Sequence, residues 1–217
     1  LKDPKGTIVL QECFDEQCTS GKNLISRKFK LKELLLWDCE NPNLYSAKIE
    51  TYNGNTLIDS KELSIGFKEF TYKKGSFFLN GEKIFVKGGF WEGVYSKHQS
   101  YPDNAEEVRH EIELAKKAGF NLLRPWRRPV PPIILEEADK AGLLIIGSPA
   151  VECMSVWPTF NEKTPERIQN EIVGLIKRDR NHPSIIWWEL FNEVTRDEMI
   201  QLIPKMVPVA RKCDPTR

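Results

Sequence analysis

The feature that most constrains the fold is a regular alternation, from about residue 81 onward, of short apolar segments with amphipathic helical patterns. The apolar segments are IFVKGGF (84–90), NLLRPW (121–126), LLIIG (143–147) and SIIWWELFNE (184–193). Apolar strands of this length, separated by helices, are typical of β-α units around a parallel sheet. We therefore predict a parallel sheet of four strands in this part of the chain.

Helix boundaries support the same division. Asp103 or Asn104 is the expected N-cap of the first helix, and Gly119 is placed as its left-handed stop. The phrases AKKAGFNLLR and ADKAGLLIIG repeat one device, in which a last helical turn and an Ala-Gly stop precede an apolar strand. Thr164 and Pro165 open the third helix, and a last amphipathic segment covers residues 196–213.

The four units occupy about 135 residues of the chain, whereas a closed (β/α)8 TIM barrel takes about 250 residues. The sequence therefore predicts the first four β-α units of a TIM barrel, which is half of that fold. We assign residues 81–217 to this N-terminal half of a barrel.

Residues 1–80 show the shorter period of an antiparallel β domain. The expected strands are 7–14, 24–31, 44–52, 56–67 and 76–81, and turn formers at 53–55, 74–75 and 80–81 separate the later ones. In LYSAKIETY the residues Tyr45, Ala47, Ile49 and Thr51 alternate with polar ones, which predicts one buried face. We expect an immunoglobulin-like β-sandwich that is incomplete, because a full one takes about 100 residues and seven strands.

Composition limits the classes of function. The chain has 217 residues, 40% of them hydrophobic and 29% charged, with a formal net charge of +1. We expect an ordinary globular protein that binds no nucleic acid, because basic residues are interspersed with acidic ones. No apolar run approaches the length of a membrane span, and LKDPKGT does not resemble a signal peptide. The chain begins at Leu1 instead of Met, so we expect a piece of a longer protein and leave its compartment open.

The cysteines and histidines predict no metal site and no cofactor. Ligand pairs such as C-x-x-C are absent, and we expect buried free thiols. His182 is predicted to be structural, and His98, in the loop after the first barrel strand, is a weaker candidate for a sugar contact. The cysteines are Cys13, Cys18, Cys39, Cys153 and Cys213.

The segment SIIWWELFNE ends abruptly in an amide and a carboxylate. Functional groups of a parallel barrel lie at the carboxyl ends of its strands, where side chains emerge from the packed interior. Asn192 and Glu193 are therefore the first candidates for chemistry, and a solvated strand end is the alternative. A carboxyl group held by a rigid strand suits proton transfer, provided that its surroundings keep it protonated near neutral pH.

Several phrases, in order, resemble glycoside hydrolase family 2, the family of β-galactosidases, β-glucuronidases and β-mannosidases. They are WDCENPNLY, IGFKEF (with Lys68 where the family has Arg), GSFFLNGEKIFVKGG, AKKAGFNLLR, RDRNHPSIIWW and FNE, and the match spans roughly residues 37–217. The resemblance implies an immunoglobulin-like domain leading into a (β/α)8 barrel. It also implies hydrolysis of terminal β-glycosidic bonds of a carbohydrate substrate with retention of configuration.

The resemblance assigns roles to individual residues. Glu193 corresponds to the general acid and base, and Asn192 to the amide that hydrogen-bonds the sugar 2-hydroxyl. Arg124 matches an arginine that would hold the nucleophilic carboxylate ionised. That nucleophile is expected from a seventh barrel strand beyond this chain, so residues 1–217 alone are expected to be inactive. Glu189 lies on the same strand as Glu193, and the favoured interpretation is an ion pair with Arg124.

Tryptophans after strand ends could stack on a sugar ring: Trp91, Trp126 and Trp157. For each of them a place in the hydrophobic core is an equal alternative. Phe90 and Phe191 depart from the family pattern, whereas RPWRRP and KGGFW lean towards its β-mannosidase-like branch. Glu152 is the remaining acid near a strand end.

Two other functions stay open. A non-catalytic carbohydrate-binding or assembly module would also carry exposed aromatic residues, and the unpaired edges of a half-barrel would favour homo-oligomers. A doubly wound nucleotide-binding fold is disfavoured because no G-x-G-x-x-G follows the first strand.

Overall fold

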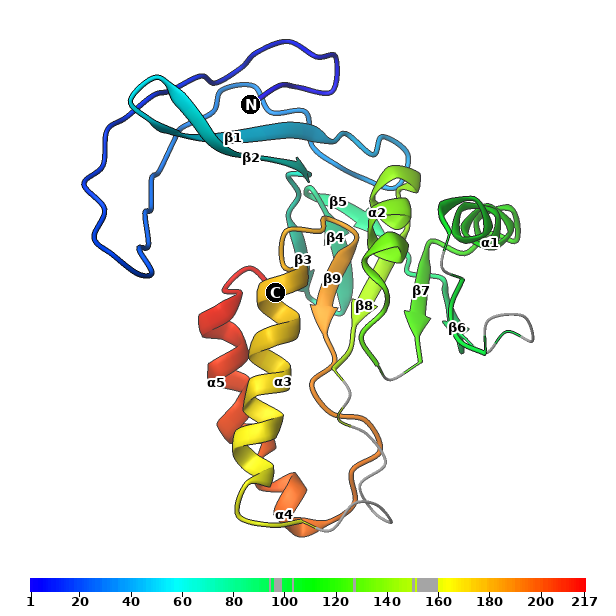
Figure 1. The fold of residues 1–217 in the computed structure, drawn as a ribbon. Coiled ribbons are helices and arrows are strands. Elements are labelled where there is room, and N and C mark those ends of the chain that lie inside the picture. Colours follow the sequence, from blue (N-terminus) through cyan, green and yellow to red (C-terminus); the bar gives the residue numbers. More distant parts are fainter. Residues whose placement is uncertain (94, 96–98, 103, 127, 150, 152–159) are drawn as a thin grey trace.

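The computed structural model describes residues 1–93, 95, 99–102, 104–126, 128–149, 151 and 160–217 (Figure 1). Its central element is a four-stranded parallel sheet in the order β6-β7-β8-β9. The strands are β6 (Gly88–Trp91), β7 (Leu122–Pro125), β8 (Leu144–Gly147) and β9 (Ile185–Trp188). The predicted parallel sheet is confirmed, although β9 is shorter than the segment 184–193 that the sequence indicated.

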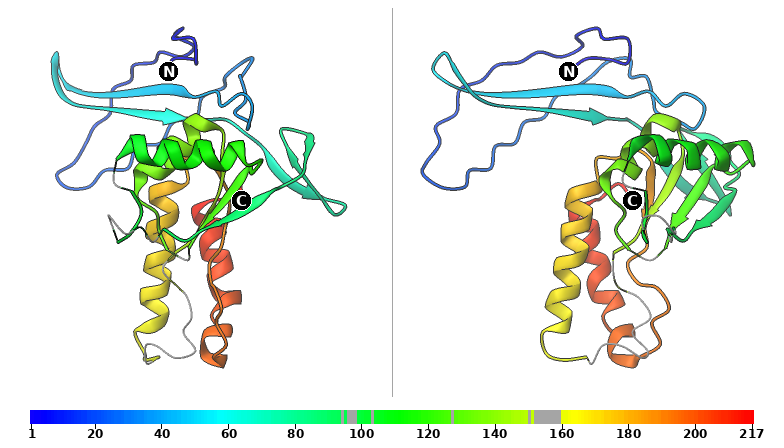
Figure 2. Two further views of the ribbon diagram at one scale, coloured as in Figure 1. Left: turned by 90° about the vertical axis from the view of Figure 1, so that its right-hand side faces the viewer. Right: turned by 45° about the vertical axis from the view of Figure 1, so that its right-hand side comes forward.

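Helices connect and flank these strands. They are α1 (Ala105–Lys117), α2 (Pro132–Ala141), α3 (Thr164–Asp179), α4 (Asp197–Ile200) and α5 (Ile203–Cys213). The first two pack against each other, and α3 and α5 lie side by side in both views of Figure 2. The expected continuous segment 196–213 is thus divided into two helices, with residues 201–202 between them.

The helix ends follow the predicted chemistry with one correction. Asn104 is the N-cap of α1 and accepts a hydrogen bond from the backbone N–H of Glu107, whereas Asp103 lies outside the described residues. Gly119 and Gly142 both have left-handed backbone angles, with φ of 88° and 69°. Thr164 is the first residue of α3 and not its cap; its hydroxyl accepts from the backbone N–H of Asn161.

The strands β7, β8 and β9 are buried or partly buried on both faces, which explains their apolar residues. Leu123, Ile145 and Ile185 pack into a cluster with residues of α1 and α2. The alternate residues face the other way and join a second cluster that includes Trp37 and Leu79 from the amino-terminal part of the chain. They are Leu122, Leu144, Ile146 and Ile186.

The amino-terminal part forms two small antiparallel sheets. One is the hairpin of β1 (Tyr45–Asn53) and β2 (Thr56–Ile65), and the other contains β3 (Phe70–Lys73), β4 (Ser76–Leu79) and β5 (Glu82–Ile84). The turn residues at 74–75 and 80–81 have positive φ, as two-residue hairpin loops require. The predicted hairpins are therefore confirmed from residue 44 onward.

Within residues 1–80, all of which the structure describes, the incomplete sandwich that the sequence predicted is formed only in part, as the hairpin of β1 and β2. Residues 7–14 and 24–31 form no strand; only isolated bridges occur before β1. Tyr45 is buried as expected, but Ile49 is 59% exposed, so the predicted buried face extends over only the start of β1. Strand formation depends on packing against a neighbouring sheet, and no second sheet covers this hairpin among the described residues.

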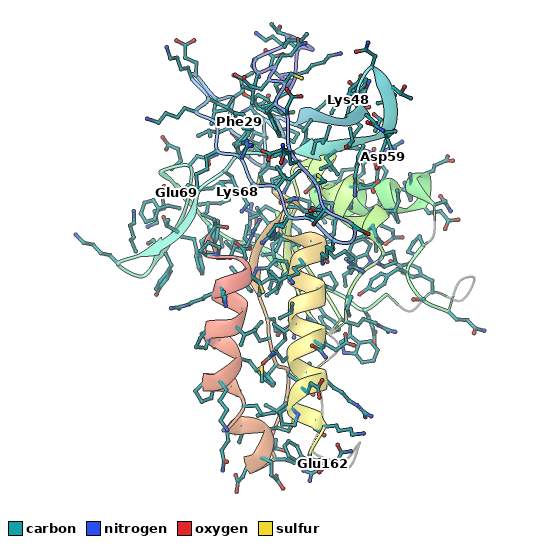
Figure 3. All side chains as sticks on the ribbon, turned by 60° about the vertical axis from the view of Figure 1, so that its left-hand side comes forward. Phe29, Lys48, Asp59, Lys68, Glu69 and Glu162 are labelled. Carbon is teal, nitrogen blue, oxygen red and sulfur yellow. The ribbon has the colours of Figure 1, made fainter. Side chains whose placement is uncertain are left out.

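A tight joint links the amino-terminal part to the parallel sheet. Trp37 is fully buried, and its indole N–H donates to the backbone carbonyl of Asp139 in α2 at 2.8 Å. His182 lies 2.6 Å from the Asp139 carboxylate, which confirms its structural role. Burial alone would lower the pKa of His182, but the hydrogen bond and charge of Asp139 outweigh burial and raise it. Lys68 lies at this joint, between the hairpin and the helical part (Figure 3).

The cysteine prediction is partly wrong. Cys39 is buried, and burial raises its pKa to about 11, but Cys13 and Cys18 are exposed. They lie in the amino-terminal segment that forms no strands, so no core surrounds them. Cys153 lies outside the described residues. None of the described helices combines the length and the apolar character that crossing a bilayer requires.

Candidate active site

The carboxyl ends of the four parallel strands bring functional side chains to one side of the sheet. In Figure 1 the arrows of β7 and β9 point away from the β1–β2 hairpin, towards this end. Arg124 lies two residues after Leu122, and Ser148 two residues after Ile146, so both continue the face that carries the Trp37 cluster. Phe90 is paired in register with Arg124. Side chains from three neighbouring strands therefore meet here.

Arg124 is the centre of this group. Its Nε and Nη2 atoms donate to Oε1 of Glu189 at 3.2 and 2.6 Å, and Nη2 also donates to Oδ1 of Asn192 at 2.7 Å. Ser148 donates to the other oxygen of Glu189 at 3.2 Å. The Phe90 ring lies over the guanidinium, with 5.5 Å between the ring centroid and the guanidinium carbon. The expected Arg124–Glu189 ion pair is confirmed.

Asn192 is held on both sides. Its backbone N–H donates to the carbonyl of Val151 at 3.1 Å, so the chain after β9 continues alongside the chain after β8. Its side-chain oxygen is taken by Arg124, whereas its Nδ2 is buried and has no hydrogen-bond partner among the described residues. A buried amide donor without a partner costs about 1–3 kcal/mol, so a ligand acceptor at this point would be stabilised.

Glu193 follows directly and has an unusual backbone. Its φ is 48°, in the left-handed region that residues with a side chain rarely adopt. Such strained positions gather at functional sites, where the surrounding structure enforces them. The side chain is exposed.

The three tryptophan candidates have different positions. Trp91 is 6% exposed and packs with α1 on the opposite face of the sheet from Arg124, and its indole N–H donates to the Tyr95 hydroxyl at 2.6 Å. This is the position of a core residue and does not favour sugar stacking. Trp126 follows β7, is partly buried, and has the Arg128 guanidinium over its ring.

Trp157 lies outside the described residues, as do His98 and Glu152. The described residues contain no group of three or more His, Cys, Asp or Glu side chains that could hold a metal ion.

Sequence reasoning missed two parts of the site. It did not single out Ser148, although a serine two residues beyond the inward-facing Ile146 is the signal that would have found it. It also did not predict the contact between Arg124 and Asn192, because it assigned Asn192 to the sugar and Arg124 to the nucleophile and to Glu189.

Comparison with known proteins identifies the family. The family model for the TIM barrel domain of glycosyl hydrolases family 2 matches residues 70–217, and a further family 2 model matches residues 1–68. A Formosa agariphila protein named "Putative beta-glucuronidase" is 32% identical over 209 residues, covering 88% of this chain and 18% of its own length. The Thermoanaerobacterium thermosulfurigenes β-galactosidase is 29% identical over 232 residues, covering all of this chain and 30% of its own length.

Solved structures agree in fold. The β-D-glucuronidase of Dictyoglomus thermophilum superimposes with a TM-score of 0.77 at 26% identity, over 86% of this chain and 34% of that one. The β-glucuronidase of Parabacteroides merdae gives a TM-score of 0.85 at 22% identity, over all of this chain and 28% of that one. The chain thus spans less than a third of the curated relatives described above. By the match of its family models, this chain belongs to the family 2 glycosyl hydrolases.

Proposed function

We propose that the complete protein hydrolyses terminal β-glycosidic bonds with retention of configuration, and that Glu193 is its general acid and base. The observation that carries this proposal is the arrangement around Asn192, in which an amide oxygen is fixed by Arg124 and a buried N–H group is left for a ligand. Membership of a glycosidase family supports the same reaction class.

In this mechanism Asn192 donates from Nδ2 to the sugar 2-hydroxyl, a contact that strengthens as the oxocarbenium-like transition state forms. Glu193, the next residue, gives its proton to the departing glycosidic oxygen and then activates the water that completes the reaction. The left-handed backbone at Glu193 turns its carboxyl group relative to Asn192, so that one residue can reach the bond and the other the ring.

The nucleophilic carboxylate is expected from a strand outside residues 1–217. Among the described residues, the hydrogen bonds of Arg124 use Nε and Nη2 and none uses the two N–H groups of Nη1. We infer that Nη1 contacts the nucleophile and favours its charged form. The sugar that the complete protein cleaves can be identified by measuring its turnover of aryl β-glycosides, including glucuronides, galactosides and mannosides.

The test is Glu193→Gln in the complete protein. Natural glycosides have poor leaving groups that need a proton, so their kcat/KM should fall by about 100-fold or more. Glycosides with an activated dinitrophenyl leaving group need little protonation, and their first step should be nearly unaffected. Equal losses for both substrate classes would refute the acid role of Glu193.

A non-catalytic carbohydrate-binding module is the second candidate function, and Nδ2 of Asn192, which has no hydrogen-bond partner among the described residues, would serve it as well. It predicts sugar binding by the complete protein without turnover of any aryl glycoside.

A further inference from the structure

Glu189 is a carboxylate in an otherwise apolar run, and the proposed mechanism gives it no role. It follows the last residue of β9 and faces the same side of the sheet as Arg124. Its side chain is only 21% exposed, and that of Arg124 is 27% exposed. Removing both charges from water is costly, so a pair in this position needs good geometry to persist.

The geometry of the pair fixes the arginine closely. Two donors of Arg124 converge on Oε1 of Glu189, and Ser148 holds Oε2, so the carboxylate cannot rotate without breaking several hydrogen bonds. The guanidinium is planar, so fixing Nε and Nη2 also fixes the direction of the second N–H group on Nη2. That group donates to Oδ1 of Asn192 at 2.7 Å.

An asparagine amide can present either its oxygen or its nitrogen in a given direction. The bond from Arg124 accepts only the orientation in which Oδ1 faces the arginine, and this orientation leaves Nδ2 as the group for a ligand. Without Glu189, the arginine is free to adopt other rotamers, and Asn192 loses the contact that selects its orientation.

We propose that Glu189 is a positioning residue: acting through Arg124, it orients Asn192 so that the amide N–H group meets the sugar 2-hydroxyl. This inference rests on the proposed function and adds a determinant of specificity for that hydroxyl. Two other roles are possible for the same ion pair, and they predict different results. A purely structural pair would affect stability alone, and a purely electrostatic one would affect substrates with and without the 2-hydroxyl equally.

The experiment compares two substrates in the complete protein, an activated aryl β-glycoside and its 2-deoxy analogue. Glu189→Gln should lower kcat/KM for the 2-hydroxy substrate by about 10- to 100-fold, the loss expected when a contacting group is displaced. For the 2-deoxy substrate the loss should be clearly smaller, because the change can then weaken only the inferred contact of Arg124 with the nucleophile and no contact with a 2-hydroxyl. The quantity to compare between variants is the ratio of kcat/KM for the 2-hydroxy substrate to kcat/KM for the 2-deoxy substrate. This comparison cancels the intrinsic difference in reactivity of the two substrates.

Glu137→Gln is the matched control. Glu137 also pairs with an arginine, Arg109, at 3.0 Å, but it does so on α2, outside the group of side chains around Arg124. This change should leave the substrate ratio as in the unchanged protein, whatever its effect on the melting temperature. A second check combines Glu189→Gln with Asn192→Ala, and the Glu189 change should then cost the 2-hydroxy substrate no more than it costs the 2-deoxy substrate.

Three results would overturn the proposal: equal losses on both substrates, no loss on either, or additive effects of the Glu189 and Asn192 changes. Each of these requires that the unchanged protein hydrolyses the substrates, so each is separate from failure of the proposed function. If the unchanged protein turns over no glycoside, the proposed function fails and the positioning role falls with it.

Discussion

At the scale of residues, the contacts of Arg124 show how much of the site could be predicted from the sequence. Its pairing with Glu189 could be predicted because both side chains lie inside the same parallel sheet, where each charge needs a partner. The position of Trp91 could not be predicted with the same certainty. It follows Phe90, and adjacent residues of a strand face opposite sides, so a shift of one residue along β6 decides whether a side chain lies beside Arg124 or in the core.

Lys68 provides a prediction at this scale. It is partly buried, and burial together with the charge of Arg217, against the opposing effects of Asp214 and Asp139, lowers its pKa from 10.5 to about 7. Between pH 7 and 10.5 the unfolded chain therefore binds more protons than the folded chain. The free energy of unfolding should rise with pH in this window, by at most about 1.4 kcal/mol per pH unit.

The measurement is urea unfolding of the complete protein at pH 7.5 and 9.5, with Lys68→Met as the comparison. The variant removes the titrating group, so its stability should increase less over this range than that of the unchanged protein. Identical increases would show that Lys68 is not responsible.

At the scale of elements, the sequence predicted two helices that each end at an Ala-Gly pair before an apolar strand. The two glycines have different surroundings in the structure. Gly119 follows the end of α1, and no atom of the described residues lies within 4 Å of a Cβ added there. Gly142 follows α2 and packs against the backbone of Cys39, whose carbonyl oxygen would lie 2.5 Å from an added Cβ. The sequence predicts the left-handed turn at Gly142. It does not predict the contact with Cys39, because Cys39 is distant along the chain.

The two glycines therefore form a matched pair. Gly119→Ala and Gly142→Ala should each lose about 1–2 kcal/mol of unfolding free energy, because both have left-handed backbone angles. Gly142→Ala should lose about 1–3 kcal/mol more, because its Cβ would overlap the Cys39 carbonyl. Chemical denaturation measures both. Equal losses of unfolding free energy would show that the backbone around Cys39 moves to accommodate the added Cβ without loss of stability.

At the scale of the whole molecule, local patterns predicted the parallel sheet well, whereas only part of the predicted sandwich is formed. One face of the strands packs against α1 and α2, so the alternation of strands and helices along the sequence was enough to predict the sheet. A sandwich instead requires a second sheet, and within residues 1–80 the hairpin has none, which leaves Ile49 and Ile58 more than half exposed. The sequence pattern was compatible with burial, but the burying partner is not among the described residues.

Exposed edges lead to a prediction for residues 1–217 expressed alone. The edge strands β6 and β9 each have only one neighbour in the described sheet, and β1 and β2 expose large apolar side chains. Unpaired edges and apolar surface favour association. Light scattering after size-exclusion chromatography should show dimers or larger species that increase with concentration. A monomer at all concentrations would contradict this expectation.

The central claim is that Glu193 and Asn192 act together on one sugar. The most direct measurement is a crystal structure of the complete protein with a bound monosaccharide-type inhibitor that retains the 2-hydroxyl. The account predicts that Nδ2 of Asn192 donates to the 2-hydroxyl and that the Glu193 carboxyl group lies within hydrogen-bonding distance of the anomeric substituent. A sugar bound elsewhere, or a Glu193 side chain directed away from it, would contradict the account.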